Sequence, residues 1–294
     1  MTTPTDLEET TPDPRTALLA DVPVDQRRLS LADIPTAVLE AGDGWPLVLL
    51  HGPGESAVKF KWNIPGLTTS FRVVAPDLPA HGASGTGTDR GPLDVERVTA
   101  WLDELIDQTC AEPPVVVGHV LGGAIAARFA VEHSDRIRHL VLVDSLGLMR
   151  FRPSPRFALG LLGFQVRPTE GSYTRFMRQC AHDLDDVQRR MGDDWALFVA
   201  YNLQLVRDDK AKECGQMFRK VGLPRIPADD LQRITAPTSL IWGRHDKANK
   251  LKKAQAVSDR FDWPLHVVDG VADDPPRDRP EAFHAALRAA LDRS

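Results

Sequence analysis

From about residue 27 onward, short and almost purely apolar runs alternate with longer stretches in which apolar residues recur every three or four positions. The apolar runs predict strands that are buried on both faces, because such strands need no polar alternation. The helical spacing predicts amphipathic helices that cover those strands. We expect strands at 46–50, 72–76, 114–118, 139–144, 238–243 and 264–269, and helices at 93–110, 122–133, 248–260 and 279–291.

Buried strands separated by helices indicate the α/β class. The stretch LSLADIPTAVLEA (29–41) adds two strands that predict a hairpin. We therefore expect a mostly parallel central sheet of about eight strands, flanked by helices on both faces.

Residues 145–232 break the alternation, because they carry helical patterns and no strand candidate. We interpret them as an inserted helical cap over the carboxyl edge of the sheet, where open α/β sheets bind ligands. The core then consists of residues 27–144 and 233–294. Residues 1–26 are rich in Thr, Pro and Asp, and we expect them to form a flexible arm.

Composition and charge argue against nucleic-acid and membrane partners. The 294 residues carry a formal net charge of −5 and no long basic run, so we expect no nucleic-acid partner. No apolar run reaches membrane-spanning length and no secretion-signal pattern is present, so we expect a cytoplasmic protein without a membrane partner. Cys110, Cys180 and Cys214 show no C-x-x-C spacing and are interpreted as idle thiols. We expect no metal, no cofactor, and a monomer or a homodimer.

The stretch VVVGHVLGGAIAARFA (115–130) predicts a strand, a tight glycine turn and a helix, with Val120 at the tip of the turn. Five further stretches accompany it: LLHGPGESA (49–57), VVAPDLPAHGASG (73–85), HLVLVDSLGL (139–148), LIWGRHDKANK (240–250) and VVDGVADDPPRDRPEAF (267–283). Together they resemble the ordered motifs of the α/β-hydrolase fold superfamily, over residues 27–291. The capped C–C bond hydrolases, esterases and epoxide hydrolases are the most similar members.

Three positions depart from the pattern that this resemblance implies. Val120 occupies the place of the serine nucleophile in the G-x-S-x-G elbow, and valine has no lone pair with which to attack. Asp273 occupies the place of the histidine base, whereas the acid position is kept as Asp246. The resemblance therefore implies that hydrolysis by a serine triad has been lost. The former oxyanion-hole region comprises Pro53, which has no N–H to donate, Gly54 and Leu121.

The residue at such an elbow normally holds an unusual backbone angle, which is least favourable for a β-branched side chain. Either this strain persists at Val120 or the turn has relaxed. We expect the adjacent His119 to be a structural histidine that points away from the pocket, and His51 and His81 to be structural as well.

If the fold is as predicted, Asp246 and Asp273 lie on neighbouring loops with their side chains close together. Two carboxylates in one partly buried site repel each other, so one pKa rises and the pair can hold a proton near neutral pH. Such a pair is a candidate acid/base dyad. Alternatively, Asp273 turns to solvent or meets Arg244 or Arg277, and Asp274 is a register alternative for the residue that faces the pocket.

Other residues are candidates for the wall of a ligand pocket. Glu55 lies in GPGES (52–56), where capping the following helix is the competing interpretation, and Asp144 lies at the end of a strand, where a structural hydrogen bond is. The aromatic residues of the cap line an apolar chamber or form the core of the cap itself. The proposed substrate-binding residues are Glu55, Asp144, Phe164, Phe176, His182, Trp195 and Tyr201.

Two functions from different classes fit this pattern. One is a non-hydrolytic enzyme of small-molecule metabolism, of a kind found in natural-product pathways, which holds a largely apolar substrate between core and cap. Acid/base groups and shape would then promote a cyclisation, rearrangement, dehydration or ring opening without a covalent intermediate. The other is a catalytically silent binding or scaffold protein. A third and weaker candidate is hydrolysis by water activated at the aspartate pair.

Overall fold

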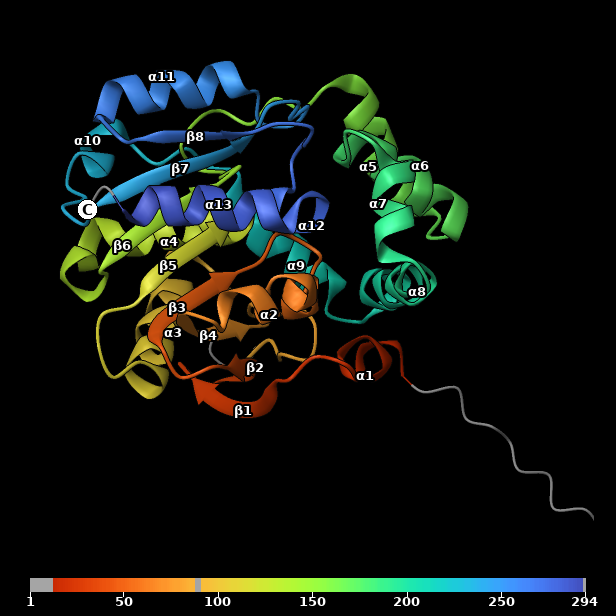
Figure 1. Ribbon diagram of the computed structural model, residues 1–294, viewed down its shortest axis with the longest axis horizontal. Helices are drawn as coiled ribbons and strands as arrows, with labels where there is room; N and C mark the ends of the chain where they lie inside the picture. The colour runs from red at the N-terminus through yellow and green to blue at the C-terminus, as the bar shows by residue number, and fades with distance from the viewer. Residues whose placement is uncertain (1–12, 88–90, 293–294) are drawn as a thin grey trace, which may run out of the picture.

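The computed structural model describes residues 13–87 and 91–292. Its centre is an eight-stranded sheet with the strand order β1-β2-β4-β3-β5-β6-β7-β8 (Figure 1). Strand β2 pairs antiparallel with both β1 and β4, and every other neighbouring pair is parallel. The strands are β1 (Asp25–Leu31), β2 (Ile34–Ala41), β3 (Trp45–Leu50), β4 (Phe71–Pro76), β5 (Val115–His119), β6 (His139–Val143), β7 (Thr238–Gly243) and β8 (Leu265–Val268).

Helices cover both faces of the sheet, as the apolar strands predict. Alternate residues of a strand point to opposite faces, so Val116 of β5 packs with Trp101 and Phe129 while Val115 and Val117 pack with Phe283 on the other face. The core helices are α2 (Ile64–Leu67), α3 (Val95–Thr109), α4 (Leu121–His133), α11 (Leu251–Phe261), α12 (Pro275–Asp278) and α13 (Pro280–Leu291), with the 3-10 helices η1 (Ala57–Trp62) and η3 (Ser134–Arg136). None of the described helices is both long and apolar enough to cross a membrane.

The segment between β6 and β7 is helical, and most of it lies beside one edge of the sheet, whereas its last helix, α10 (Ala228–Leu231), returns to the opposite end (Figure 1). Its contacts identify this edge as the carboxyl ends of the strands. Ile226 donates a backbone hydrogen bond to Gly147 after β6, and His182 stacks on His245 after β7. The helices are α5 (Pro155–Val166), α6 (Glu170–Cys180), α7 (Leu184–Met191), α8 (Asp194–Arg207), α9 (Ala211–Met217), the π-helix η4 (Phe218–Gly222) and α10 (Ala228–Leu231).

The expectation of a flexible arm over residues 1–26 is wrong for residues 13–26. Helix α1 (Pro14–Leu19) begins at the N-cap Asp13 and buries Leu18, and strand β1 already starts at Asp25. Arg15 pairs with the buried carboxylate of Asp77 at 2.9 Å. The Pro- and Thr-rich composition of the segment predicted disorder, although this short helix carries apolar residues that pack against the core. Residues 1–12 lie outside the described residues.

Candidate active site

Val120 forms a strained turn between β5 and α4. Its φ of 48° and ψ of −100° lie in a region that a β-branched residue rarely adopts. The turn is held in place because the Val120 N–H donates to Val143 O at 3.0 Å and its carbonyl accepts from Ala124 and Leu146. A Cβ on Gly122 would lie 2.6 Å from the Leu50 carbonyl carbon, so only glycine fits there. The strain therefore persists, at a cost of about 1–3 kcal/mol.

The three residues of the former oxyanion-hole region occupy different environments. Pro53 is half-buried, Gly54 is exposed with a φ of 70°, and Leu121 is fully buried as the first residue of α4. The next N–H along this helix, that of Gly122, is already engaged, because it donates to His51 O at 3.0 Å.

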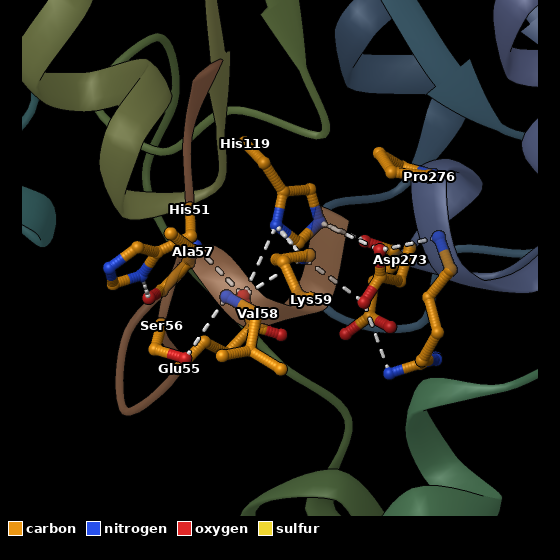
Figure 2. A network of polar contacts seen from close by, with 12 residues as sticks. His51, Glu55, Ser56, Ala57, Val58, Lys59, His119, Asp273 and Pro276 are labelled. Carbon is orange, nitrogen blue, oxygen red and sulfur yellow. Dashed lines mark hydrogen bonds and ion pairs between the residues drawn. The ribbon is translucent and has the colours of Figure 1, made fainter. Parts of the chain in front are cut away.

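A buried lysine that sequence reasoning missed lies beside the elbow (Figure 2). Lys59 of η1 is 2% exposed. Its ammonium donates to His119 Nδ1 at 2.7 Å, to Glu55 Oε2 at 2.9 Å and to Asp274 Oδ2 at 3.2 Å. All three of its protons therefore have an acceptor. The only signal in the sequence is the spacing of four residues between Glu55 and Lys59, which occurs in many surface ion pairs.

His119 is a hydrogen-bonded structural histidine in this arrangement. Since its Nδ1 accepts from an ammonium, its Nε2 carries the proton and donates to the backbone oxygen of Asp273 at 2.8 Å. Both ring nitrogens are occupied. His119 thus links the elbow to the loop after β8 and has no free nitrogen with which to act as a base.

Lys59 and Arg277 together balance the nearby acids. Burial acts to raise the pKa of Glu55 and of Asp274, but the Lys59 ammonium outweighs it, and the pKa of each acid lies below its usual range. The Arg277 guanidinium, itself buried, pairs with Asp274 at 3.1 Å and with Asp278 at 2.7 Å. We call Glu55, Lys59, His119, Asp274 and Arg277 the lysine network.

Ligand atoms of Glu55, His119 and Asp274 lie within 4.8 Å of one another, which is close enough for a metal site. The Lys59 ammonium contacts all three residues. The donor set is therefore already matched to a positive charge that the chain supplies itself.

A second cluster contains three carboxyl groups: Asp144 after β6, Asp246 after β7 and Asp273 after β8. Asp144 Oδ1 accepts from the Gly243 N–H at 3.1 Å, and Asp246 Oδ1 accepts from the N–H groups of Ala248 and Asn249. The buried Oδ2 atoms of Asp144 and Asp246 and the buried Oδ1 of Asp273 have no partner. We call these residues the carboxyl cluster.

The carboxyl cluster favours protonated acids. Burial raises the pKa of Asp246 to about 6. Burial, and then the charge of Asp246, raise the pKa of Asp144 and of Asp273 well above the usual range. A proton on either Asp144 or Asp246 lets these two carboxyls hydrogen-bond to each other. Asp246 and Asp273 thus influence each other electrostatically, and Asp144, proposed from the sequence as a substrate-binding or structural residue, is a third member of the cluster.

The raised pKa of Asp246 predicts a pH dependence of stability. A carboxyl group whose pKa rises from about 3.9 in the unfolded chain stabilises the fold while it is protonated. This contribution is fully present below about pH 4 and is lost as the pH rises through about 6. We expect the free energy of unfolding, measured by urea denaturation from pH 4 to 7, to fall less steeply in Asp246→Asn than in the parent. Equal slopes would contradict the assignment.

The aromatic residues proposed to bind substrate contact other side chains, mostly within the cap. The Phe164 ring stacks on Phe176 with centroids 6.1 Å apart, and Trp195 lies 6.2 Å from Tyr173. The Tyr201 hydroxyl accepts from Arg15 at 2.9 Å. These contacts favour the alternative interpretation, a core internal to the cap.

His182 does not reach toward a pocket as proposed. It is exposed and stacks on the exposed His245 ring at 4.0 Å. Its place at the end of α6 turns it toward the β7 loop at the surface.

Two cavities bear on where a ligand can bind. One of about 20 Å³ lies between core and cap, with Glu55 in its wall. The other, of about 670 Å³, is lined by Trp45, Arg72 and Asp107 among others, at the opposite end of the parallel strands. Only the smaller cavity borders the segment that follows β3, where Pro53 and Gly54 lie.

Comparison with known proteins agrees with this architecture. The family model described as "alpha/beta hydrolase fold" matches residues 46–271. The magnesium-chelatase 30 kDa subunit of Rhodobacter capsulatus is 39% identical over 222 residues, which cover 72% of this chain and 75% of that protein. The 2-hydroxymuconate semialdehyde hydrolase of Pseudomonas sp. (strain CF600) is 33% identical over 129 residues, which are 42% of this chain and 44% of that protein.

A solved structure extends the likeness of the fold. The 2-hydroxy-6-oxo-6-phenylhexa-2,4-dienoate hydrolase from Rhodococcus sp. strain RHA1 superposes with a TM-score of 0.80 at 24% identity, over 92% of this chain and 99% of that one. The match of fold, of family model and of sequence over most of the chain confirms the predicted resemblance. The chain belongs to the α/β-hydrolase fold family.

Proposed function

We propose that this protein is a non-hydrolytic enzyme that performs acid/base chemistry on a small, largely apolar molecule held between core and cap. The observation that supports this proposal is the carboxyl cluster, where the buried Oδ1 of Asp273 lacks a partner even when Asp144 and Asp246 share a proton. Buried polar atoms are normally paired, so an orphaned carboxyl oxygen at this place points to a missing partner. Carboxyl groups at this edge of an α/β sheet are where a substrate would find them.

The residues around the elbow support chemistry without a covalent intermediate. Val120 offers no nucleophile, and His119 has both nitrogens engaged. Asp273 and Val120 are each only partly buried. A protonated Asp273 would donate its proton to a carbonyl, epoxide or hydroxyl oxygen and recover one from the substrate later in the reaction. Such proton transfer to and from the substrate would promote cyclisation, rearrangement, dehydration or ring opening.

A catalytically silent binding or scaffold protein is the second candidate. It is favoured by the small cavity between core and cap, about 20 Å³, and by a lysine network whose donors are all used internally. One relative is named as a subunit of magnesium chelatase, which supports a role within a larger assembly.

Asparagine substitutions in the carboxyl cluster distinguish these candidates. We expect Asp273→Asn and Asp246→Asn to lower turnover by about 100-fold or more, because the amide neither gives nor takes the proton. Turnover would be followed by mass spectrometry on a panel of hydroxy ketones, epoxides and conjugated enones, and p-nitrophenyl acetate should be hydrolysed only at the background rate.

Asp269→Asn is the matched control. Asp269 follows β8 as well, but it is exposed and pairs with Arg244, so its loss should leave turnover unchanged. Unchanged turnover in the two cluster variants would overturn the acid/base proposal. Binding of panel members with no product from the parent would establish the silent binding protein instead, and ester cleavage by the parent would reinstate hydrolysis.

A further inference from the structure

A thiol and an imidazole meet across the boundary between cap and core. His81, in the loop after β4, places its Nε2 3.0 Å from the Sγ of Cys214 in the cap helix α9. Its Nδ1 lies 2.8 Å from the carbonyl oxygen of Pro79. Because a carbonyl only accepts, Nδ1 carries the proton and the lone pair of Nε2 faces the thiol. A nucleophile, a base and a group that orients the base are therefore aligned.

The surroundings favour transfer of the thiol proton to His81. Burial acts to raise the pKa of the Cys214 thiol, but His81 and the Gly54 N–H outweigh it and lower this pKa below the usual range. No histidine acts on the other two thiols, and burial outweighs the groups that lower the pKa of Cys110 and of Cys180, so both pKa values are raised. Cys214 thus differs from the other two thiols of the same chain, and its contact with His81 is the reason to ask whether it is reactive.

Cys214 borders a very small cavity. Cys214 is half-buried and lines the cavity of about 20 Å³ together with Gly54, Glu55, His81 and Lys210. A space of this size holds about one water molecule. Val120 is not among the residues that line it, so this thiol does not replace the nucleophile of the elbow.

We propose that Cys214 is a peroxide-reactive thiol, with His81 as its base and a small hydroperoxide, such as hydrogen peroxide, as its reagent. The Cys214 thiolate attacks one peroxide oxygen, so the S–O bond forms as the O–O bond breaks. Sulfur loses two electrons to the peroxide and becomes a sulfenic acid. The departing hydroxide takes the proton from the His81 imidazolium and leaves as water. Reagents much larger than water are excluded by the size of the cavity, unless α9 moves.

The full-length protein tests this directly. We treat it at pH 7 with equimolar hydrogen peroxide and dimedone, which traps sulfenic acids, and locate the adduct by peptide mass spectrometry. We expect labelling at Cys214 at least about tenfold faster than at Cys110, which is also half-buried and serves as the internal control. Cys214→Ser should abolish this label. Equal labelling of the two cysteines would overturn the proposal.

A second measurement isolates the role of His81. The rate of alkylation of Cys214 by iodoacetamide should reach half of its maximum at a pH clearly below about 8.5, the midpoint of a free thiol. In His81→Gln the midpoint should move up toward that value and the peroxide rate should fall about tenfold. An unchanged profile in this variant would remove His81 from the mechanism. If the variant fails to fold, the comparison of Cys214 with Cys110 in the parent still tests whether Cys214 reacts with peroxide.

Discussion

Replacing Lys59 with methionine is expected to lower the free energy of unfolding by about 3–5 kcal/mol, the cost of leaving buried charges without their counterion. The ammonium is the shared donor to Glu55, His119 and Asp274. Methionine fills a similar volume but donates no hydrogen bond, so the two carboxylates and the histidine lose a common partner. Urea denaturation at pH 7 measures the loss.

Lys61→Met is the matched control for this prediction. Lys61 belongs to the same 3-10 helix η1 and is also buried, but its partners Asp21 and Asp194 are 74% and 26% exposed. Water can replace the lysine at these carboxylates, so we expect a loss of only about 1 kcal/mol. Similar losses in the two variants would show that the lysine network has no special electrostatic role.

The loss of unfolding free energy in Lys59→Met should also depend on pH. In the parent, the lowered pKa values of Glu55 and Asp274 contribute stability above the pKa of the unfolded chain, and this stability is lost as the pH falls through the folded values. Without the ammonium, burial raises the pKa of Glu55, and Asp274 keeps Arg277 as a counterion but loses Lys59. The difference between parent and variant is therefore expected to shrink as the pH falls toward about 4.

Gly243→Ala is expected to destabilise the protein by about 3 kcal/mol or more, because the added Cβ would clash with backbone in a packed core. A Cβ at this position would lie 2.8 Å from the carbonyl carbon of Ala272 and closer still to its oxygen. The obstacle is backbone, so no side chain can rotate away. The loop is also pinned, because the His245 N–H donates to Val271 O at 2.9 Å.

The same substitution should disturb the carboxyl cluster. The Gly243 N–H donates to Asp144, and the opposing Ala272 immediately precedes Asp273. Gly163→Ala in helix α5 is the control, since a Cβ there meets nothing within 4 Å and should stabilise the helix by up to about 1 kcal/mol. A Gly243→Ala protein as stable as the parent would mean that the loop after β8 yields easily, and the geometry of the cluster would then be adaptable.

Two adjacent aspartates divide the site into electrostatic regions of opposite character. Asp274 joins the lysine network, where a cation lowers its pKa, whereas Asp273 joins the carboxyl cluster, where burial and Asp246 raise its pKa. His119 connects the two regions through the backbone oxygen of Asp273. The register question of the sequence therefore has a physical answer: each aspartate has its own set of partners, and the orphaned oxygen belongs to Asp273.

The sequence by itself determined the strands, the family and the elbow. Apolar runs report burial on both faces of a sheet, and the glycines around Val120 report a turn too tight for other residues; both are local properties of the chain. The departure at the elbow, a valine at its tip, was likewise readable without coordinates, and the structure added that its strain persists.

Only the tertiary structure decided which side chains meet. Lys59 reaches His119 from 60 residues away, and Cys214 reaches His81 from 133 residues away. Periodicity shows that a face is buried but carries no information about the partner buried against it. For the same reason the cap aromatics could not be assigned to a ligand or to their own core, because that depends on how the cap helices are rotated against one another.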